Sequence, residues 1–177
     1  MKRIMTLLLV VLLGISLCSC VLKEESMMKN KDRRTADKQL QMIMDAIQTH
    51  DREKLLSLFT EDSYYEANKS DETVEELFDY FRGEIKELDD WGGPYVETSR
   101  ENDYIIQIAE STYDIKTTVS EYRFAIRYII QDTKNPQNIG VESLYIIRTA
   151  DDTDTSYAYW GDGTFAPGIH IGIPNSI

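Results

Sequence analysis

The sequence predicts an α+β domain in which three N-terminal helices pack on a strongly curved antiparallel sheet. Two patterns predict this order: apolar residues recur at helical spacing in the first half, and from Tyr104 onward they alternate with polar residues as in strands. The composition supports a buried core, since 42% of the residues are hydrophobic and 10% aromatic, with only four prolines and nine glycines. At 177 residues, the chain has the length of one domain.

The chain is strongly acidic. It has 19 Lys and Arg against 31 Asp and Glu, which gives a net charge of -12 at pH 7. Because nucleic-acid binding depends on basic residues that neutralise phosphates, we expect no nucleic-acid partner. The same charge would attract a cationic partner.

The first nineteen residues have the features of an export signal. Lys2 and Arg3 precede an apolar run from Met5 to Leu17. This run is shorter than the roughly 20 residues of a membrane-spanning helix but has the length of a secretory hydrophobic region. Leu17-Cys18-Ser19-Cys20 is similar to a lipobox, in which the last Cys is diacylated before cleavage. The sequence therefore predicts a lipoprotein signal peptide over residues 1–19.

Cys20 is the expected lipidation site, because using Cys18 would place bulky Leu17 where the peptidase requires a small residue. An ordinary secretory peptide with incidental cysteines is the alternative. Two acyl chains, at about 0.8 kcal/mol per buried methylene, would hold the protein durably on the extracytoplasmic face of the cell membrane. With Cys20 acylated, we expect no disulfide and no thiolate metal site.

Residues 20–34 alternate charges without an apolar period, which predicts a flexible tether after the lipidated Cys20. The folded domain is then expected over residues 35–177, including a C-terminal tail. The first helix is capped by Thr35 and ends at His50, the second is capped by Asp51, and the third begins at Ser70 or Asp71 and ends near Gly83. The apolar faces are Ala36, Leu40, Ile43, Met44 and Ile47, then Leu55, Leu58 and Phe59, then Val74, Leu77, Phe78 and Phe81.

The second half predicts strands. Residues 104–117 alternate but change parity, which predicts a β-bulge near residues 110–112. Residues 121–132 and 141–149 alternate around a turn-rich segment and predict a hairpin. Facing the apolar sets together predicts Tyr128 opposite Tyr145 and Ile126 opposite Ile147, within a slip of two residues. Residues 169–173 are expected to fold back onto the domain.

Residues 36–173 resemble an uncharacterised family of bacterial lipoproteins with an NTF2-like (SnoaL-like) domain of unknown function. The resemblance rests on EYRFAIRYIIQDTKNPQNIGVESLYII at residues 121–147, with LLSLF at 55–59, ELFDYFRG at 76–83 and YDIKTT at 113–118. It implies a cone-shaped fold with a cavity at its wide end. Because that family has no established activity, the resemblance supplies no catalytic residues.

Strand tyrosines and two flanking tryptophans are the candidate cavity lining, because such rings combine an apolar body with a polar tip. They are Tyr104, Tyr113, Tyr122, Tyr128, Tyr145, Trp91 and Trp160. The alternative is that these rings are simply core. Asp89-Asp90-Trp91-Gly92-Gly93 is a possible cavity rim, or an ordinary loop between elements.

No catalytic residues are assigned. His50 and His170 could each act as a general base, but neither has a visible partner, and they read as a helix-end and an edge-strand residue. The acidic loop that begins at Asp152 does not fit the calcium-binding EF-hand spacing. We therefore expect that the protein binds no metal and no cofactor and that it is not an enzyme.

The leading functional prediction is a membrane-anchored domain that binds a small molecule or peptide in its cavity. The second is an interaction or immunity lipoprotein whose acidic surface binds a basic protein. The third is an extracytoplasmic enzyme of the isomerase or hydratase kind, which would need a carboxylate or histidine with a shifted pKa inside the cavity.

Overall fold

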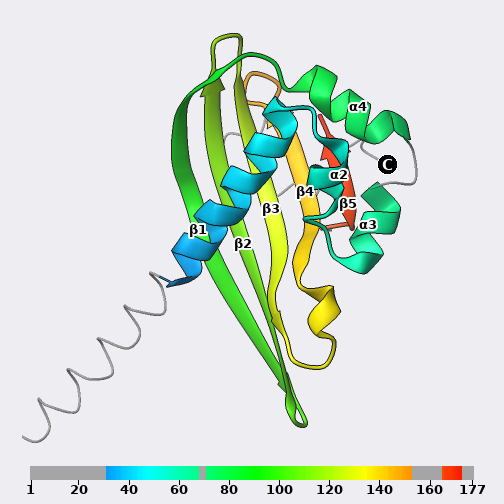
Figure 1. Cartoon of the computed structure of the whole chain (residues 1–177). Helices are drawn as coiled ribbons and strands as arrows, with labels where there is room; N and C mark the ends of the chain where they lie inside the picture. The colour runs from blue at the N-terminus through cyan, green and yellow to red at the C-terminus, as the bar shows by residue number, and fades with distance from the viewer. Residues whose placement is uncertain (1–30, 68–70, 153–164, 173–177) are drawn as a thin grey trace, which may run out of the picture. The chain divides into compact units, whose positions relative to one another are not determined.

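The computed structural model describes residues 31–67, 71–152 and 165–172. The chain divides into two units, Met1–Arg34 and Thr35–Ile177. Within the second unit, five strands form one curved, open sheet in the order β1-β2-β3-β4-β5 (Figure 1). The strands are β1 (Ile85–Glu101), β2 (Tyr104–Thr117), β3 (Glu121–Asp132), β4 (Gly140–Arg148) and β5 (Gly168–Ile171). The α+β class predicted from the sequence is confirmed.

The sheet is not wholly antiparallel. Strands β1 to β4 follow one another as antiparallel neighbours, but β5 pairs with β4 in parallel, from Ser143 beside Gly168 to Ile146 beside Ile171. The end of the chain therefore does return to the sheet, as the sequence predicted. Its direction was not predicted, because residues 168–171 are too few to carry a directional pattern.

In the part of the chain that the structure describes, four helices precede the sheet, where the sequence predicted three. They cover residues 31–48, Arg52–Leu56 (α2), Glu61–Ala67 (α3) and Asp71–Tyr80 (α4). The additional helix, α3, was missed because only Ser63 and Ala67 of its residues are buried, so it has no apolar stripe. Among the described residues, none of the helices is both long and apolar enough to cross a bilayer.

The helix boundaries differ in detail from the prediction. Residues 31–34 are already helical, so Thr35 lies inside the first helix rather than capping it, and the predicted tether is shorter at this end. The cap of α2 is confirmed, because the backbone N–H of Lys54 donates to Asp51 Oδ1 at 2.9 Å. The start of α4 at Asp71 is confirmed as well.

Strand β1 contains the segment expected to be a loop. Asp89 to Gly93, with Trp91, lie within it rather than beside the sheet. A strand is normally recognised by alternating apolar and polar residues, but β1 lacks this pattern. Its pairing with β2 shifts register three times between residues 85 and 95, and each shift interrupts the alternation. At Gly93, where φ is +104°, a Cβ would lie 2.5 Å from the carbonyl oxygen of Glu110, so glycine is required there. The irregularity predicted in β2 near residues 110–112 thus lies in the facing strand.

The hairpin of β3 and β4 is confirmed, but its predicted register is wrong. Ile126 pairs with Leu144 instead of Ile147, a slip of three residues, and Tyr128 pairs with Val141 instead of Tyr145, a slip of four. The odd slip reverses the faces of β4 from Ser143 onward. Leu144 and Ile146 belong to the core cluster shared with the helices, whereas Tyr145 and Ile147 cluster with Ala125 on the other face. Because the register shifts after Arg127, Val141 also lies on the helix side. It has the same odd numbering as Tyr145 and Ile147, so the alternation in the sequence wrongly placed all three on one face.

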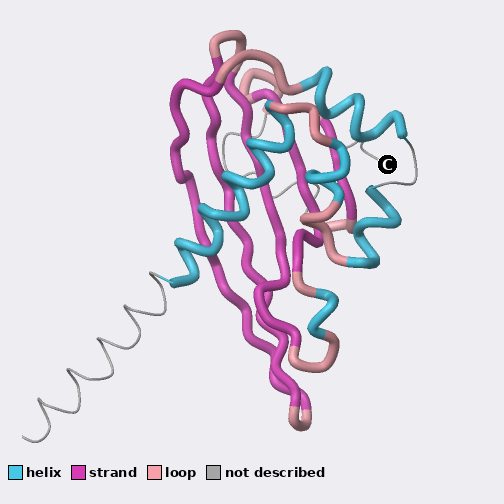
Figure 2. Tube along the Cα trace, viewed as in Figure 1, coloured by secondary structure: helices cyan, strands magenta, loops and turns pink. Residues whose placement is uncertain are grey.

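The main core lies between the helices and one face of the sheet (Figure 2). It joins the apolar faces of the first helix, α2 and α4 to alternate residues of β2, β3 and β4. The largest side chains with under 2% exposure include Tyr113, Tyr128, Phe124, Leu40, Ile43, Met44, Ile47, Leu55, Leu77 and Ile115. All three predicted apolar helix faces are therefore buried as expected.

Asp132 orders the turn after β3 and makes stability depend on pH. The backbone N–H groups of Asn135 and Lys134 donate to its Oδ1 at 2.8 and 2.9 Å, and these bonds lower the pKa of the carboxyl below its ordinary value. Because the folded-state pKa lies below the unfolded one, the stabilisation is present above the unfolded pKa and is lost as pH falls through the folded pKa.

We therefore expect Asp132→Asn to lower the free energy of unfolding at neutral pH and to flatten its decline between about pH 5 and pH 2. Urea unfolding at a series of pH values measures both effects. Asp103→Asn, in the exposed β1–β2 turn, is the matched control. Equal pH profiles for the two variants would contradict the assignment.

Candidate functional site

The predicted tyrosines do not form one site. Tyr113, Tyr122 and Tyr128 lie in the helix-facing core and are at most 2% exposed. Tyr145 lies on the other face of the sheet, and Tyr104 lies at the start of β2 with Lys134 Nζ 4.9 Å from the centre of its ring. Trp91 is in β1, and Trp160 lies outside the described residues.

Two of these tyrosines use their hydroxyl groups to connect elements of the fold. Tyr122 Oη accepts from the backbone N–H of Arg82 at 3.0 Å and donates to the carbonyl oxygen of Tyr80 at 2.9 Å. Tyr145 Oη accepts from the backbone N–H of Ala166 at 3.0 Å. These hydroxyls therefore have a structural role, which fits the alternative interpretation of the tyrosines as core.

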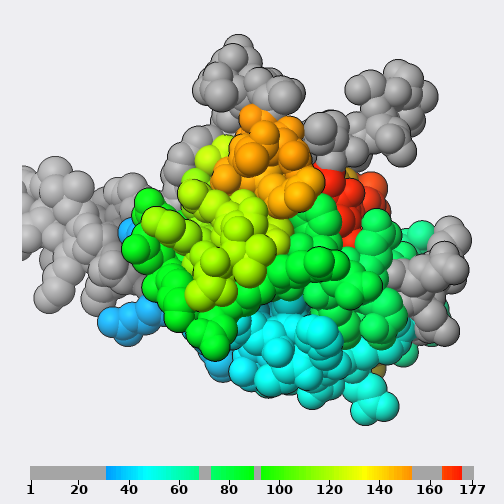
Figure 3. All heavy atoms as spheres, turned by 90° about the horizontal axis from the view of Figure 1, so that it is seen from above, coloured from blue at the N-terminus to red at the C-terminus, as the bar shows by residue number. Residues whose placement is uncertain are grey.

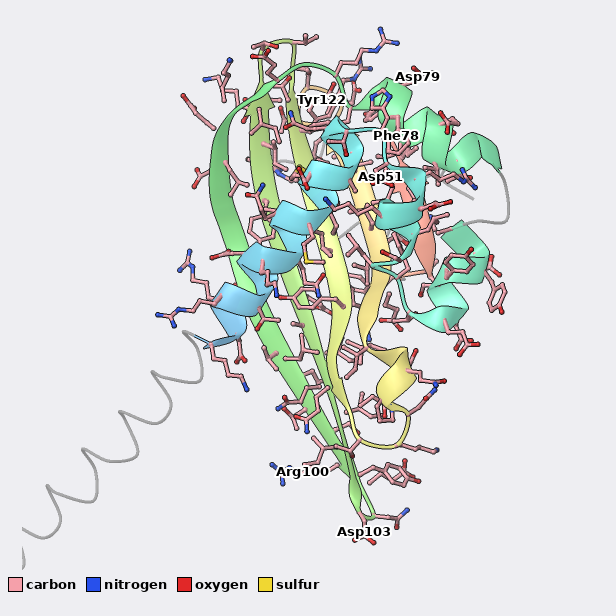
Figure 4. The ribbon with its side chains drawn as sticks, viewed as in Figure 1. Asp51, Phe78, Asp79, Arg100, Asp103 and Tyr122 are labelled. Atoms are coloured by element: carbon pink, nitrogen blue, oxygen red, sulfur yellow. The ribbon has the colours of Figure 1, made fainter. Side chains whose placement is uncertain are left out.

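A groove of about 520 Å³ lies where the first helix ends beside the end of α4 and the link into β1. Figure 3 looks onto this end of the domain, where the end of the first helix and α2 (cyan) adjoin α4 and β1 (green). Figure 4 shows Phe78, Asp79 and Tyr122 at this end, with Arg100 and Asp103 at the opposite end of the sheet. The lining residues are Ile47, Gln48, His50, Phe78, Asp79, Phe81, Arg82, Gly83 and Glu84.

The groove has an apolar floor and a polar rim. Ile47, Phe78 and Phe81 are 1%, 4% and 5% exposed, so the core itself forms the floor. The rim carries an imidazole, an amide, two carboxylates and a guanidinium, all on exposed residues, namely His50, Gln48, Asp79, Glu84 and Arg82. An apolar surface with a few polar groups around it is the general character of small-molecule sites.

His50 occupies a backbone position that normally favours glycine. Its φ is +51°, and it ends the first helix through bonds from its own N–H to Ile47 O at 3.2 Å and from Asp51 N–H to Ala46 O at 2.9 Å. A side chain in this left-handed conformation is disfavoured by about 1 kcal/mol. The imidazole stacks on Phe78, with 4.9 Å between ring centres and 6° between planes. His50 therefore ends the helix in a disfavoured conformation, and its ring lies on the groove.

Asp79 also lies where helix physics disfavours it. It is in the last turn of α4, which contains no basic residue, and a carboxylate is unfavourable near a helix C-terminus. Among the described residues, no cation lies within ion-pair distance of its carboxylate. Arg82 Nε donates instead to the backbone carbonyl of Asp79, at 2.7 Å. Glu84, by contrast, pairs with Lys86 at 3.0 Å.

The other face of the sheet carries a layer of ion pairs, here called the outer-face network. It consists of Arg123 between Asp114 and Asp152, and Arg127 between Glu110 and Glu142. Arg123 binds both oxygens of Asp114, at 2.7 and 2.9 Å, and these bonds raise the pKa of its guanidinium. Because each arginine already has two carboxylates, the network is suited to holding the fold rather than binding a ligand.

His170, the other candidate base, belongs to β5 at the edge of the sheet, as predicted. Its ring stacks on Tyr145 at 4.3 Å, and its Nε2 lies 2.8 Å from the carbonyl oxygen of Ala166. These contacts attach β5 and the preceding residues to the sheet. Within the described ranges, no group of three or more His, Cys, Asp or Glu is placed to hold a metal ion.

Sequence reasoning found His50 but missed the groove around it. Phe78 was assigned only to a core face, and Asp79 and Arg82 were not considered. The sequence did hold one signal, an acidic residue in the last turn of a helix that ends before Gly83, against the usual charge preference. The convergence of the two helix ends needed the tertiary structure.

The comparisons with known proteins bear on the family but on no activity. No curated protein is similar enough to the chain to count as a match. A protein family described as a domain of unknown function (DUF5104) matches residues 42–149, from the first helix to the end of β4, which is more than half of the chain. The matched region includes all residues that line the groove. The chain therefore belongs to the DUF5104 family.

Proposed function

We propose that this protein is a lipid-anchored extracytoplasmic binding domain that takes up a small molecule or peptide in the groove between the first helix and α4. The observation that carries the proposal is the stack of His50 on Phe78 over an apolar floor. A residue held in a disfavoured conformation at a concave, partly apolar surface is a feature of ligand sites.

The membrane anchor is supported by the sequence alone. Cys20 follows a short apolar run and a small residue, as in a lipobox, and lies outside the described residues. The finer fold assignment, an NTF2-like cone, is supported by helices that pack on one face of a curved sheet whose strands β1 to β4 are antiparallel.

The groove is a better binding site than the strand tyrosines. Tyr113, Tyr122 and Tyr128 are at most 2% exposed, so a ligand would have to displace core side chains to reach them. The groove needs no such change, because its rim residues are exposed.

Binding is favoured over catalysis because the rim has no oriented acid or base. A general base is normally aligned by a hydrogen bond from a third group. Among the described residues, neither the ring nitrogens of His50 nor the carboxylate of Asp79 have such a partner. The stack on Phe78 positions His50 as a contact surface instead.

A fragment screen by NMR on the full chain in mild detergent tests the proposal. We expect bound fragments to shift the signals of His50 and Phe78. His50→Asn keeps a residue that tolerates the left-handed turn but removes the ring, so affinity should fall by about 0.5 to 1.5 kcal/mol with little change in stability. Fragments that shift only signals of the strand tyrosines, or a variant with unchanged affinity, would contradict the proposal.

A basic protein is the second candidate partner, favoured by the net charge of -12. Such a partner would be steered by the acidic surface, so its association rate should fall steeply as salt is added. A complex of this kind that forms equally well with His50→Asn would favour this second function over the first.

A further inference from the structure

The groove lies at the negative ends of two helices. The first helix ends at residue 48 and α4 at Tyr80, and residues from both ends line the groove. Each helix C-terminus acts as about half a negative charge. Without any side chain, the backbone therefore already favours a positive group at this place.

Asp79 adds a full negative charge at the same place. Its carboxylate has no cation within ion-pair distance among the described residues, whereas the other acidic residue of the rim, Glu84, is paired with Lys86. The guanidinium of Arg82 is turned to the backbone oxygen of Asp79, where it caps α4. Among the described residues, Asp79 is thus the rim carboxylate that has no ion-pair partner.

Two departures from favourable local structure border one groove. His50 is strained in its backbone, and Asp79 is placed against the helix dipole. Stable proteins tolerate such departures mainly where function requires them. Each concerns a different property, conformation in one case and charge in the other, so together they indicate what the groove recognises.

We propose that the groove takes a ligand with a single positively charged amine next to an apolar or aromatic group, and that Asp79 is the anionic anchor for the amine. This inference rests on the proposed function and specifies its ligand class. The ammonium group would neutralise Asp79 and the C-terminal end of the first helix, because Arg82 already caps α4. The apolar part would cover Ile47 and Phe81 and contact the edge of the His50–Phe78 stack.

Three probes with the same phenyl group and different charge test this: 2-phenylethylamine, 2-phenylethanol and 3-phenylpropionate. Titrated into the full chain in mild detergent, the amine should bind about tenfold more tightly than the alcohol, and the carboxylate more weakly still. All binding is followed through the NMR signals of His50 and Phe78.

Asp79→Asn should reduce the affinity for the amine to that for the alcohol, and it should raise the melting temperature of the free protein because it removes a charge from the wrong helix end. Glu76→Gln, on the same helix but outside the groove, is the matched control. It should leave the affinity for the amine within about twofold of the original value.

Each outcome decides one claim. If the alcohol or the carboxylate binds as tightly as the amine, with shifts at His50 and Phe78, the charge inference is wrong while the proposed function stands. If Asp79→Asn and Glu76→Gln weaken the amine equally, the whole acidic surface attracts the amine and Asp79 is not its anchor. If no probe shifts these signals, the inference is wrong and the proposed function depends on the fragment screen alone.

Discussion

Replacing Cys20 by alanine is expected to abolish lipidation and with it the durable attachment of the protein to the membrane. The thiol of Cys20 is the predicted acceptor of the diacyl group, and no other residue of Leu17-Cys18-Ser19-Cys20 has both a thiol and a small residue before it. The variant should therefore accumulate as an uncleaved precursor or appear in the soluble fraction.

The physical reason is the size of the lipid contribution. One acyl chain gives marginal, reversible membrane binding. Two chains, at about 0.8 kcal/mol per buried methylene, give stable anchoring. The described residues offer no helix that could take over this role. Loss of the diacyl group should thus act almost as an all-or-none change.

Intact mass and membrane fractionation of the cells that produce the protein measure the result. Cys18→Ala is the matched control, because it removes a thiol two residues away and should leave processing and attachment unchanged. A Cys20→Ala protein that is still cut at the same bond and still fractionates with membranes would show that the lipobox assignment is wrong.

The helices and the central strands could be predicted because their burial is periodic. Leu40, Ile43 and Ile47 repeat at helical spacing, and Tyr122, Phe124 and Ile126 alternate, and both sets are buried as those patterns imply. Asp51 could be assigned as a cap because its side chain acts within three residues along the chain. Local physics determines these features, so the sequence alone was sufficient.

Register and the strand β1 could not be predicted in the same way. The pairing of Ile126 with Leu144 depends on a bulge in β4, and an odd slip reverses which of its residues face the core. In β1, the shifts around Gly93 break the period-two pattern. In both strands the irregular pairing depends on the neighbouring strand, so the sequence of one strand alone does not predict it.

The groove shows the same division between local and tertiary information. The position of His50 at the end of a helix was visible in the sequence, and the structure confirms it. Its stacking partner Phe78 lies on a different helix, so only the packing of the first helix against α4 brings the two rings together. The sequence shows the charge of Asp79, but only the tertiary structure places that charge beside the end of a second helix.

The outer-face network leads to the second large effect, on stability. Arg123 lies between Asp114 and Asp152, and the three side chains are only 15%, 16% and 10% exposed. Arg123→Ala would remove the cation that these two largely buried carboxylates share. Breaking a fully buried pair costs 3 to 5 kcal/mol, so with this residual exposure we expect a loss of about 2 to 3 kcal/mol in the free energy of unfolding.

Arg148→Ala is the matched control for this variant. Arg148 likewise forms an ion pair with an aspartate, Asp151 at 2.6 Å, but its side chain is 50% exposed. Because solvent screens such a pair, its loss should cost much less than the loss of Arg123. Urea unfolding of both variants at neutral pH measures the difference, and equal losses would show that burial does not strengthen the Arg123 pairs.

The same variant separates structure from binding. Arg123 lies on the face of the sheet that carries Tyr145 and is not among the residues that line the groove. At temperatures where Arg123→Ala remains folded, its affinity for 2-phenylethylamine should therefore equal that of the original protein, whereas Asp79→Asn should show the reverse pattern of higher stability and lost affinity. A parallel loss of stability and affinity in Arg123→Ala would mean that the groove depends on the whole sheet, and that Asp79 and His50 alone do not define it.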